Sequence, residues 1–150
     1  MTRDCSTIHP RIGLGDLKFG ASRKEVRAYL GEPEAIDDSD MPGGWLRWEY
    51  PAIGIYADFD DDLALRLISL TIENPNATLR GHKLIGLDSN AALQTAAGLE
   101  LGPYKRAEDA LGWEAEFHDA SLEFRFDDDR LWLISWRVII DEDDVVHWPE

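Results

Sequence analysis

The side chains that could act as bases, nucleophiles or metal ligands are few and widely spaced along this chain. His118 precedes Asp119 at the predicted end of a strand, but adjacent strand residues point to opposite faces, so the pair is not placed for acid–base work. Cys5 is the only cysteine, which excludes a disulfide framework and a thiolate metal cluster. None of the four histidines lies at a spacing typical of a metal site; they are His9, His82, His118 and His147.

Other reactive patterns are also missing from the sequence. Ser69 and Ser135 recur at matching places, but each lies in an apolar run with no base nearby, which is typical of strand interiors. Asp60–Asp62 and Asp127–Asp129 lack the alternating acids and glycine of a calcium loop. Gly13-Leu14-Gly15 does not continue into a phosphate-binding pattern. We therefore predict no catalytic residues, no metal and no cofactor, and a protein that is not an enzyme.

The chain repeats one structural unit about 66 residues apart. Phe59 and Asp60–Asp62 precede the run Leu65–Leu70, and Phe126 and Asp127–Asp129 precede the run Leu131–Trp136. A second pair, beginning at Leu46 and Leu111, is shifted by 65. One copy alone would bury little apolar surface, so we expect both to share one core.

Each copy is expected to begin with a short helix. Ser22 and Glu25 form a capping box, Gly31 provides a stop, and Asp88 is the expected cap of the second helix. Alternating apolar residues predict three strands after each helix, with strands at 46–50, 53–59 and 65–72 in the first copy. The second copy is expected to have strands at 111–118, 121–126 and 131–140. The segment 37–44 is expected to be a loop.

These elements predict an α+β fold. We expect a tandem repeat of a helix plus three antiparallel strands, with one continuous antiparallel sheet and the helices on one face. The chain would be a single domain, 1–150, with repeats at about 12–76 and 80–140 and an acidic C-terminal tail.

Composition limits the partners that such a domain could bind. Thirty acidic residues against 15 basic residues give a net charge of −15, which disfavours nucleic acid and anionic membrane and would attract a basic partner. Plain solubility is an alternative explanation of this charge. No apolar run is long enough for a membrane span, and no secretory signal precedes His9, so we expect a cytoplasmic protein without membrane contact.

Aromatic residues and repeated acidic turns are the candidate partner-binding elements. Trp132 and Trp136 share one face of a strand, where they would form an exposed row or fill the core of the sheet. The two Asp triplets would either be ordinary solvated turns or form an acidic rim around the aromatic patch. The predicted partner-binding residues are Asp60, Asp61, Asp62, Trp113, Asp127, Asp128, Asp129, Trp132 and Trp136.

The segment Leu17–Pro33 fits the pattern FG-x-S-x-x-E-V-x-x-x-LG-x-P. This pattern resembles the helical start of SmpA/OmlA-type domains and of β-lactamase-inhibitor-protein-like folds. The latter are tandem repeats whose concave sheet binds a protein partner. The lipid-modified cysteine of the SmpA/OmlA lipoproteins does not transfer to Cys5, because no apolar export segment precedes it. Small acidic cytosolic proteins of this type also resemble bacterial immunity proteins of contact-dependent inhibition or type VI secretion systems.

This resemblance implies a non-catalytic inhibitor that neutralises a cognate toxin domain, such as a basic nuclease. We expect it to be a monomer or weak dimer when alone. A self-associating scaffold whose apolar sheet face pairs with itself is the alternative, and a small apolar ligand beneath the sheet is a third possibility.

Overall fold

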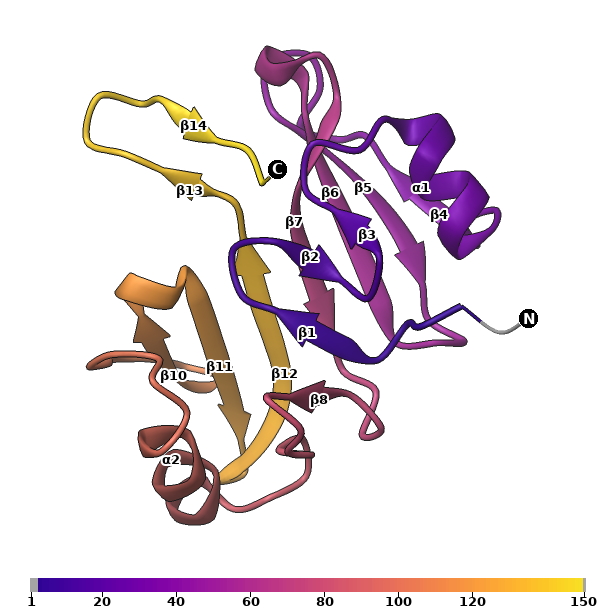
Figure 1. Cartoon of the computed structure of the whole chain (residues 1–150). Helices are drawn as coiled ribbons and strands as arrows, with labels where there is room; N and C mark the ends of the chain where they lie inside the picture. The colour runs from indigo at the N-terminus through magenta and orange to yellow at the C-terminus, as the bar shows by residue number, and fades with distance from the viewer. Residues whose placement is uncertain (1–2, 150) are drawn as a thin grey trace.

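A computed structural model describes residues 3–149 of the chain, and an eight-stranded antiparallel sheet dominates it (Figure 1). The strands follow the order β4-β5-β6-β7-β12-β11-β10-β9, so that one half of the sheet comes from each half of the chain. The first half contains β4 (Ala35–Asp37), β5 (Trp45–Tyr50), β6 (Ile55–Asp60) and β7 (Arg66–Ile72). The second half contains β9 (Lys105–Asp109), β10 (Gly112–Phe117), β11 (Leu122–Asp127) and β12 (Arg130–Arg137).

The two helices are short, and both begin as the sequence predicts. α1 (Arg23–Leu30) has the complete capping box of Ser22 and Glu25, and ends at Gly31 with φ of 92°. α2 (Ser89–Ala97) is capped by Asp88, whose side chain accepts a hydrogen bond from the Ala91 backbone N–H at 2.8 Å. These caps satisfy backbone donors that a helix N-terminus otherwise leaves unpaired.

Short strands complete the molecule. A second sheet is formed by β1 (Thr7–His9), β2 (Gly13–Leu14), β3 (Leu17–Lys18) and β8 (Thr78–Leu79). A C-terminal hairpin consists of β13 (Ile139–Ile140) and β14 (Val146–His147). Single-turn 3₁₀ helices, η1 (Asp61–Leu63) and η2 (His118–Ala120), connect β6 to β7 and β10 to β11.

The predicted fold class was wrong. Strands contain 42% of the residues and helices 16%, so the molecule is mostly β rather than a repeat of a helix and three strands. Each half of the large sheet has a fourth strand, β4 or β9, at its outer edge. The sequence does not predict these strands, because their residues are mostly exposed and β9 consists almost entirely of charged residues. Asp37, the last residue of β4, lies within the segment 37–44 for which the sequence predicts a loop.

Strand pairing relates the two halves by an approximate twofold axis. β7 pairs with β12, and Thr71 lies directly opposite Ser135 where the halves meet. Phe59 of β6 corresponds to Phe126 of β11, an offset of 67 residues, whereas Leu67 of β7 corresponds to Leu131 of β12, an offset of 64. The offset changes because η1 lengthens the β6–β7 connection, whereas a two-residue turn joins β11 to β12.

The connection before each helix pairs with the sheet in the same way in both halves. Gly20 donates a backbone hydrogen bond to Leu67, and Gly86 donates one to Leu131, both at 2.8 Å. These two glycines have φ of 95° and 99°, in the region that favours glycine. Their equivalence agrees with the 66-residue repeat seen in the sequence at this point.

A single apolar core fills the space between the large sheet, the two helices and the small sheet. Phe59 and Phe126 occupy equivalent places in it and are fully buried. Trp136 is 1% exposed, and its indole Nε1–H donates a hydrogen bond of 2.9 Å to the Gly13 carbonyl oxygen. This bond ties the small sheet to the middle of the large sheet, on the side of the two helices.

Candidate functional site: the open face of the sheet

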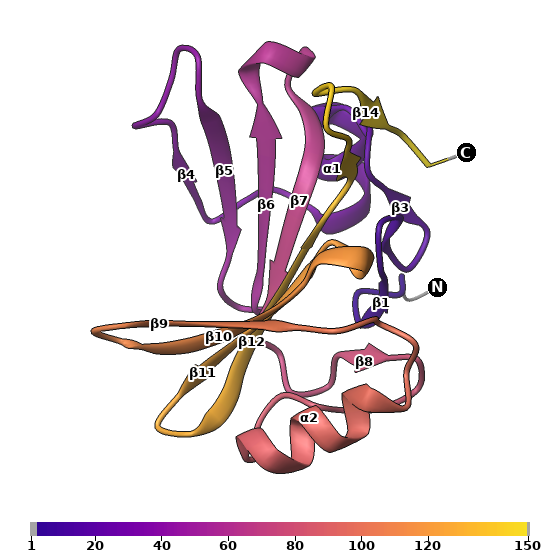
Figure 2. The same ribbon diagram turned by 90° about the vertical axis from the view of Figure 1, so that its left-hand side faces the viewer.

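The candidate site is the face of the large sheet that points away from both helices, called the open face below. Figure 2 shows α1, α2 and the small sheet on one side of the bent large sheet, with no helix in the angle between its two halves. Strand residues alternate between faces, so the open face carries the residues that lie between core positions. On the six inner strands they are Trp45, Arg47, Glu49, Tyr56, Asp58, Ser69, Thr71, Glu114, Glu116, Glu123, Arg125, Leu133, Ser135 and Arg137, and on β9 they include Asp109.

The centre of the open face lies on the approximate twofold axis. The Thr71 and Ser135 hydroxyl oxygens are 2.7 Å apart in a hydrogen bond that joins the two halves. Asp58, Ser69 and Thr71 are buried although they are polar, because the bend of the sheet brings its halves together here. A pocket of about 130 Å³ opens above them.

A bidentate ion pair occupies the first half of the open face. The Arg47 Nε and Nη2 atoms donate to the two carboxylate oxygens of Asp58 at 2.8 and 3.0 Å. The Asp58 side chain is 2% exposed and the Arg47 side chain 42%. Hydrogen bonding to Asp58 raises the pKa of the Arg47 guanidinium. The pair gives the buried carboxylate its counter-charge while part of the guanidinium remains accessible.

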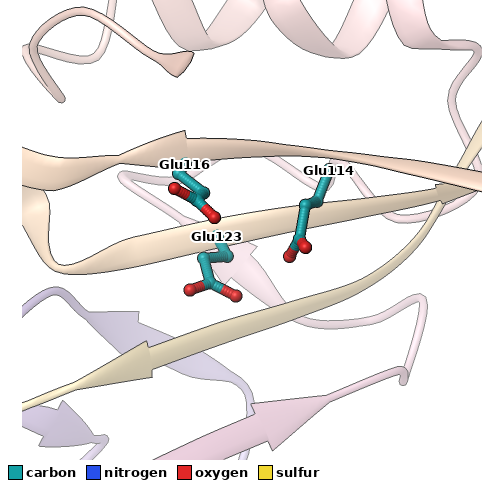
Figure 3. A group of neighbouring side chains, drawn as sticks. All are labelled: Glu114, Glu116 and Glu123. Carbon is teal, nitrogen blue, oxygen red and sulfur yellow. The ribbon is translucent and has the colours of Figure 1, made fainter. Parts of the chain in front are cut away.

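Three carboxylates gather in the second half of the open face. Carboxylate oxygens of Glu114, Glu116 and Glu123 all lie within 4.8 Å of one another (Figure 3). Burial, followed by the negative charge of Glu114, raises the pKa of Glu123. Oxygen ligands of this type suit hard cations. Arg125 approaches Glu114 to 3.8 Å, so part of the negative charge is already balanced within the protein.

The two halves of the open face carry opposite arrangements of charge at equivalent places. Arg47 on β5 faces Asp58 on β6, whereas Glu114 on β10 faces Arg125 on β11. The Arg125 Nη2 atom also donates to Asp109 at 2.6 Å, which lowers the pKa of Asp109 to about 2. The open face is therefore a mixed-charge surface and not a uniformly acidic one.

The predicted Asp triplets do not lie together. Asp60–Asp62 sit at the β6–β7 connection and Asp127–Asp129 at the β11–β12 turn, at opposite ends of the molecule in both views (Figures 1 and 2). The Asp60 carboxylate accepts from the Asp62 backbone N–H at 2.8 Å, and Asp61 accepts from Gly43 at 2.9 Å.

The second triplet also makes local contacts and forms its own turn. Asp129 accepts from the Ser89 hydroxyl at 2.6 Å. Asp128 and Asp129 have φ of 51° and 59°, the left-handed pair typical of a two-residue hairpin. The approximate twofold axis thus places the two triplets at opposite ends of the sheet, so they do not form a single acidic rim.

The predicted tryptophans occupy three different environments. Trp136 is in the core, so the core-filling alternative holds for that residue. Trp113 is half-buried on the helix side, where its ring stacks on Phe126 with centroids 4.1 Å apart. Trp132 is 47% exposed at an irregularity of the β11–β12 pairing, beside the β5–β6 turn. An aromatic row does not form, because the irregular pairing displaces Trp132 from the alternation.

Sequence reasoning missed the residues that make up the open face. The clearest signal was the alternation itself, since Arg47 and Glu49 lie between the buried Leu46, Trp48 and Tyr50. Trp45, at the start of the same strand, is 41% exposed and lines the pocket on this face.

Comparisons with known proteins bear on the fold alone. No known protein family matches the sequence, and no curated protein matches it. The crystal structure of an extracellular protein containing an SCP domain, from Bacillus anthracis strain Ames, is similar with a TM-score of 0.50 at 12% identity. The similarity covers 97% of this chain and 51% of that protein, so this chain spans about half of its length. Within residues 3–149, neither helix is long and apolar enough to cross a membrane.

Proposed function

We propose that this chain is a non-catalytic protein inhibitor of the immunity type, which binds a cognate basic toxin domain, such as a nuclease, through its open face. The observation that carries the proposal is the uncovered sheet face itself. It combines an exposed tryptophan, an accessible guanidinium and a group of carboxylates on one face of the sheet. Interfaces typically contain such aromatic and arginine anchors with a polar surround.

The charge of the chain supports a basic partner. A net charge of −15 attracts a cationic protein over a distance set by ionic strength. At close range, the carboxylate group of Glu114, Glu116 and Glu123 would accept lysine or arginine side chains. The Arg47–Asp58 pair would add a specific contact of mixed charge.

Capture of the partner is the first test. The tagged chain serves as bait in the source cell, and the products of neighbouring reading frames are also assayed directly for binding. A basic toxin domain bound at a one-to-one ratio, with its activity suppressed, is the expected result. Failure to bind or suppress any of these products, together with a bait that elutes as a free dimer, favours the self-associating scaffold.

Two matched variants then test the open face. Trp45→Ala should raise the dissociation rate of the captured partner, whereas Ile12→Ala should leave it unchanged. The two side chains are similarly exposed, at 41% and 44%, but Ile12 lies in the β1–β2 connection, away from the open face. Glu123→Lys should weaken binding further by placing a positive charge against a basic partner. Equal effects of Trp45→Ala and Ile12→Ala would refute the assignment to this face.

A further inference from the structure

The outer edge of β9 is an unpaired strand edge. β9 is the last strand of the large sheet, and within residues 3–149 it pairs only with β10. Four of its five residues are exposed, and Figure 2 shows it at the outer edge of the second half of the sheet. Such an edge presents backbone donors and acceptors to any strand of suitable sequence.

The charges along β9 have a self-complementary order. The strand reads Lys105, Arg106, Ala107, Glu108, Asp109, with two cations, a small central residue and two anions. If a second copy lies antiparallel with Ala107 opposite Ala107, each cation faces an anion. Lys105 then faces Asp109 of the other copy, and Arg106 faces Glu108. Opposite charges directly across an antiparallel pair are stabilising and like charges are destabilising.

From this order we propose that two copies of the chain associate through β9. The two sheets join edge to edge, antiparallel about Ala107, into one continuous sheet across a twofold axis. The proposal is independent of the toxin-binding function, because it uses the edge of the sheet and not its open face.

The same charges disfavour other pairings of this edge. A parallel arrangement in register would set Lys105 against Lys105 and Glu108 against Glu108. The Arg106 guanidinium lies 3.9 Å from the centre of the Trp113 ring, and its Nη2 atom is 2.6 Å from a Glu108 carboxylate oxygen. These contacts hold both side chains on the helix side of the sheet, where each meets its opposite charge in the second copy.

The other outer edge provides a contrast. β4 has only three residues, Ala35, Ile36 and Asp37, and it carries no cation. Antiparallel pairing of two copies there would form no ion pair. The strong negative charge of each chain opposes any association, so we expect a weak dimer that appears only as concentration rises.

Charge reversal within the strand tests the arrangement. Arg106→Glu and Glu108→Arg each replace two attractive cross-strand pairs of the dimer with two repulsive ones, so each should weaken self-association roughly 10- to 100-fold. The double variant Arg106→Glu/Glu108→Arg restores both pairs in reversed order and should recover dimerisation. Ile36→Glu on β4 is the matched control and should leave the dimer unchanged. Sedimentation equilibrium up to about 1 mM protein measures all five chains.

Glu108→Arg distinguishes pairing through β9 from a general effect of net charge, because this substitution makes the chain two charges less negative. If repulsion between the net charges of the two chains alone controlled association, this variant would associate more tightly, whereas pairing through β9 predicts weaker association. A wild-type chain that remains monomeric at every concentration overturns the proposal. So does a dimer that both single variants retain, or one that the double variant fails to recover while its circular dichroism remains native.

Discussion

Breaking the Arg47–Asp58 pair should destabilise the fold in a way that depends on pH. Arg47→Met keeps the aliphatic length of the side chain but leaves the Asp58 carboxylate buried without its counter-charge. Two charge-assisted hydrogen bonds are lost, and each is worth about 1.5–3 kcal/mol where water is excluded. Because the Arg47 side chain is 42% exposed, solvent screens part of this energy, and we expect a net loss of about 2–3 kcal/mol at pH 7.

The pH dependence follows from the carboxylate that remains. Without the guanidinium, the ionised carboxylate of Asp58 is buried without a counter-charge, and protonation at low pH removes that unpaired charge. The deficit of Arg47→Met should therefore shrink as pH falls towards about 4.

Urea denaturation followed by tryptophan fluorescence measures the loss at several pH values. Arg47→Met/Asp58→Asn is the control, and it should recover part of the stability because no charge remains buried. A loss below about 0.5 kcal/mol at pH 7, or a loss that is the same at pH 4.5, would show that the ion pair does not hold the centre of the open face.

Three further predictions concern single positions. Glu123→Gln should stabilise the protein by about 0.5–1 kcal/mol at pH 7, since Glu123 faces Glu116 across the strands. The raised pKa of Glu123 means that its ionised carboxylate destabilises the folded state, so the gain should vanish below about pH 4, where this carboxyl group is protonated in both the folded and the unfolded chain. Urea titration at both pH values checks this prediction. Trp136→Phe should cost about 1–3 kcal/mol by removing a buried hydrogen bond and part of the indole ring from the core, whereas Trp132→Phe should stay within about 0.5 kcal/mol in the same assay. Gly20→Ala and its equivalent Gly86→Ala should each lower the free energy of unfolding by about 1 kcal/mol in thermal denaturation, because alanine is strained at these positive φ angles. The loss should be larger at Gly20, where an added Cβ lies 3.1 Å from an indole ring, and a larger loss at Gly86 would contradict this.

Local sequence signals predicted where the two helices begin, but they did not predict how many strands the sheet contains. The Ser22–Glu25 cap and the Asp88 cap follow from side chains that satisfy nearby backbone donors, so no distant contact is needed to define them. β9 was missed because an edge strand buries little, so its sequence lacks the apolar alternation by which strands are recognised. The repeat was visible in the sequence, but the residue offset between equivalent strands was not. The β6–β7 connection is longer than the β11–β12 turn, and this changes the offset between β7 and β12.

The candidate site was harder to predict than the elements. Asp60–Asp62 and Asp127–Asp129 stand out as clusters along the chain, but they lie at opposite ends of the folded molecule. The sequence repeat matched Ser135 with Ser69, but in the structure Ser135 meets Thr71, because β7 pairs with β12. Likewise, Glu114 and Glu123 come together through the pairing of β10 with β11.

The sequence by itself determined the two capped helices, the internal repeat, the strongly acidic charge and the scarcity of reactive groups, because each depends on residue types or on contacts between near neighbours. The tertiary structure alone decided which strands lie side by side, which tryptophan is in the core and which side chains share the open face. The physical reason is that strand register is set by packing and by the length of connections, and a shift of one residue moves every side chain to the other face.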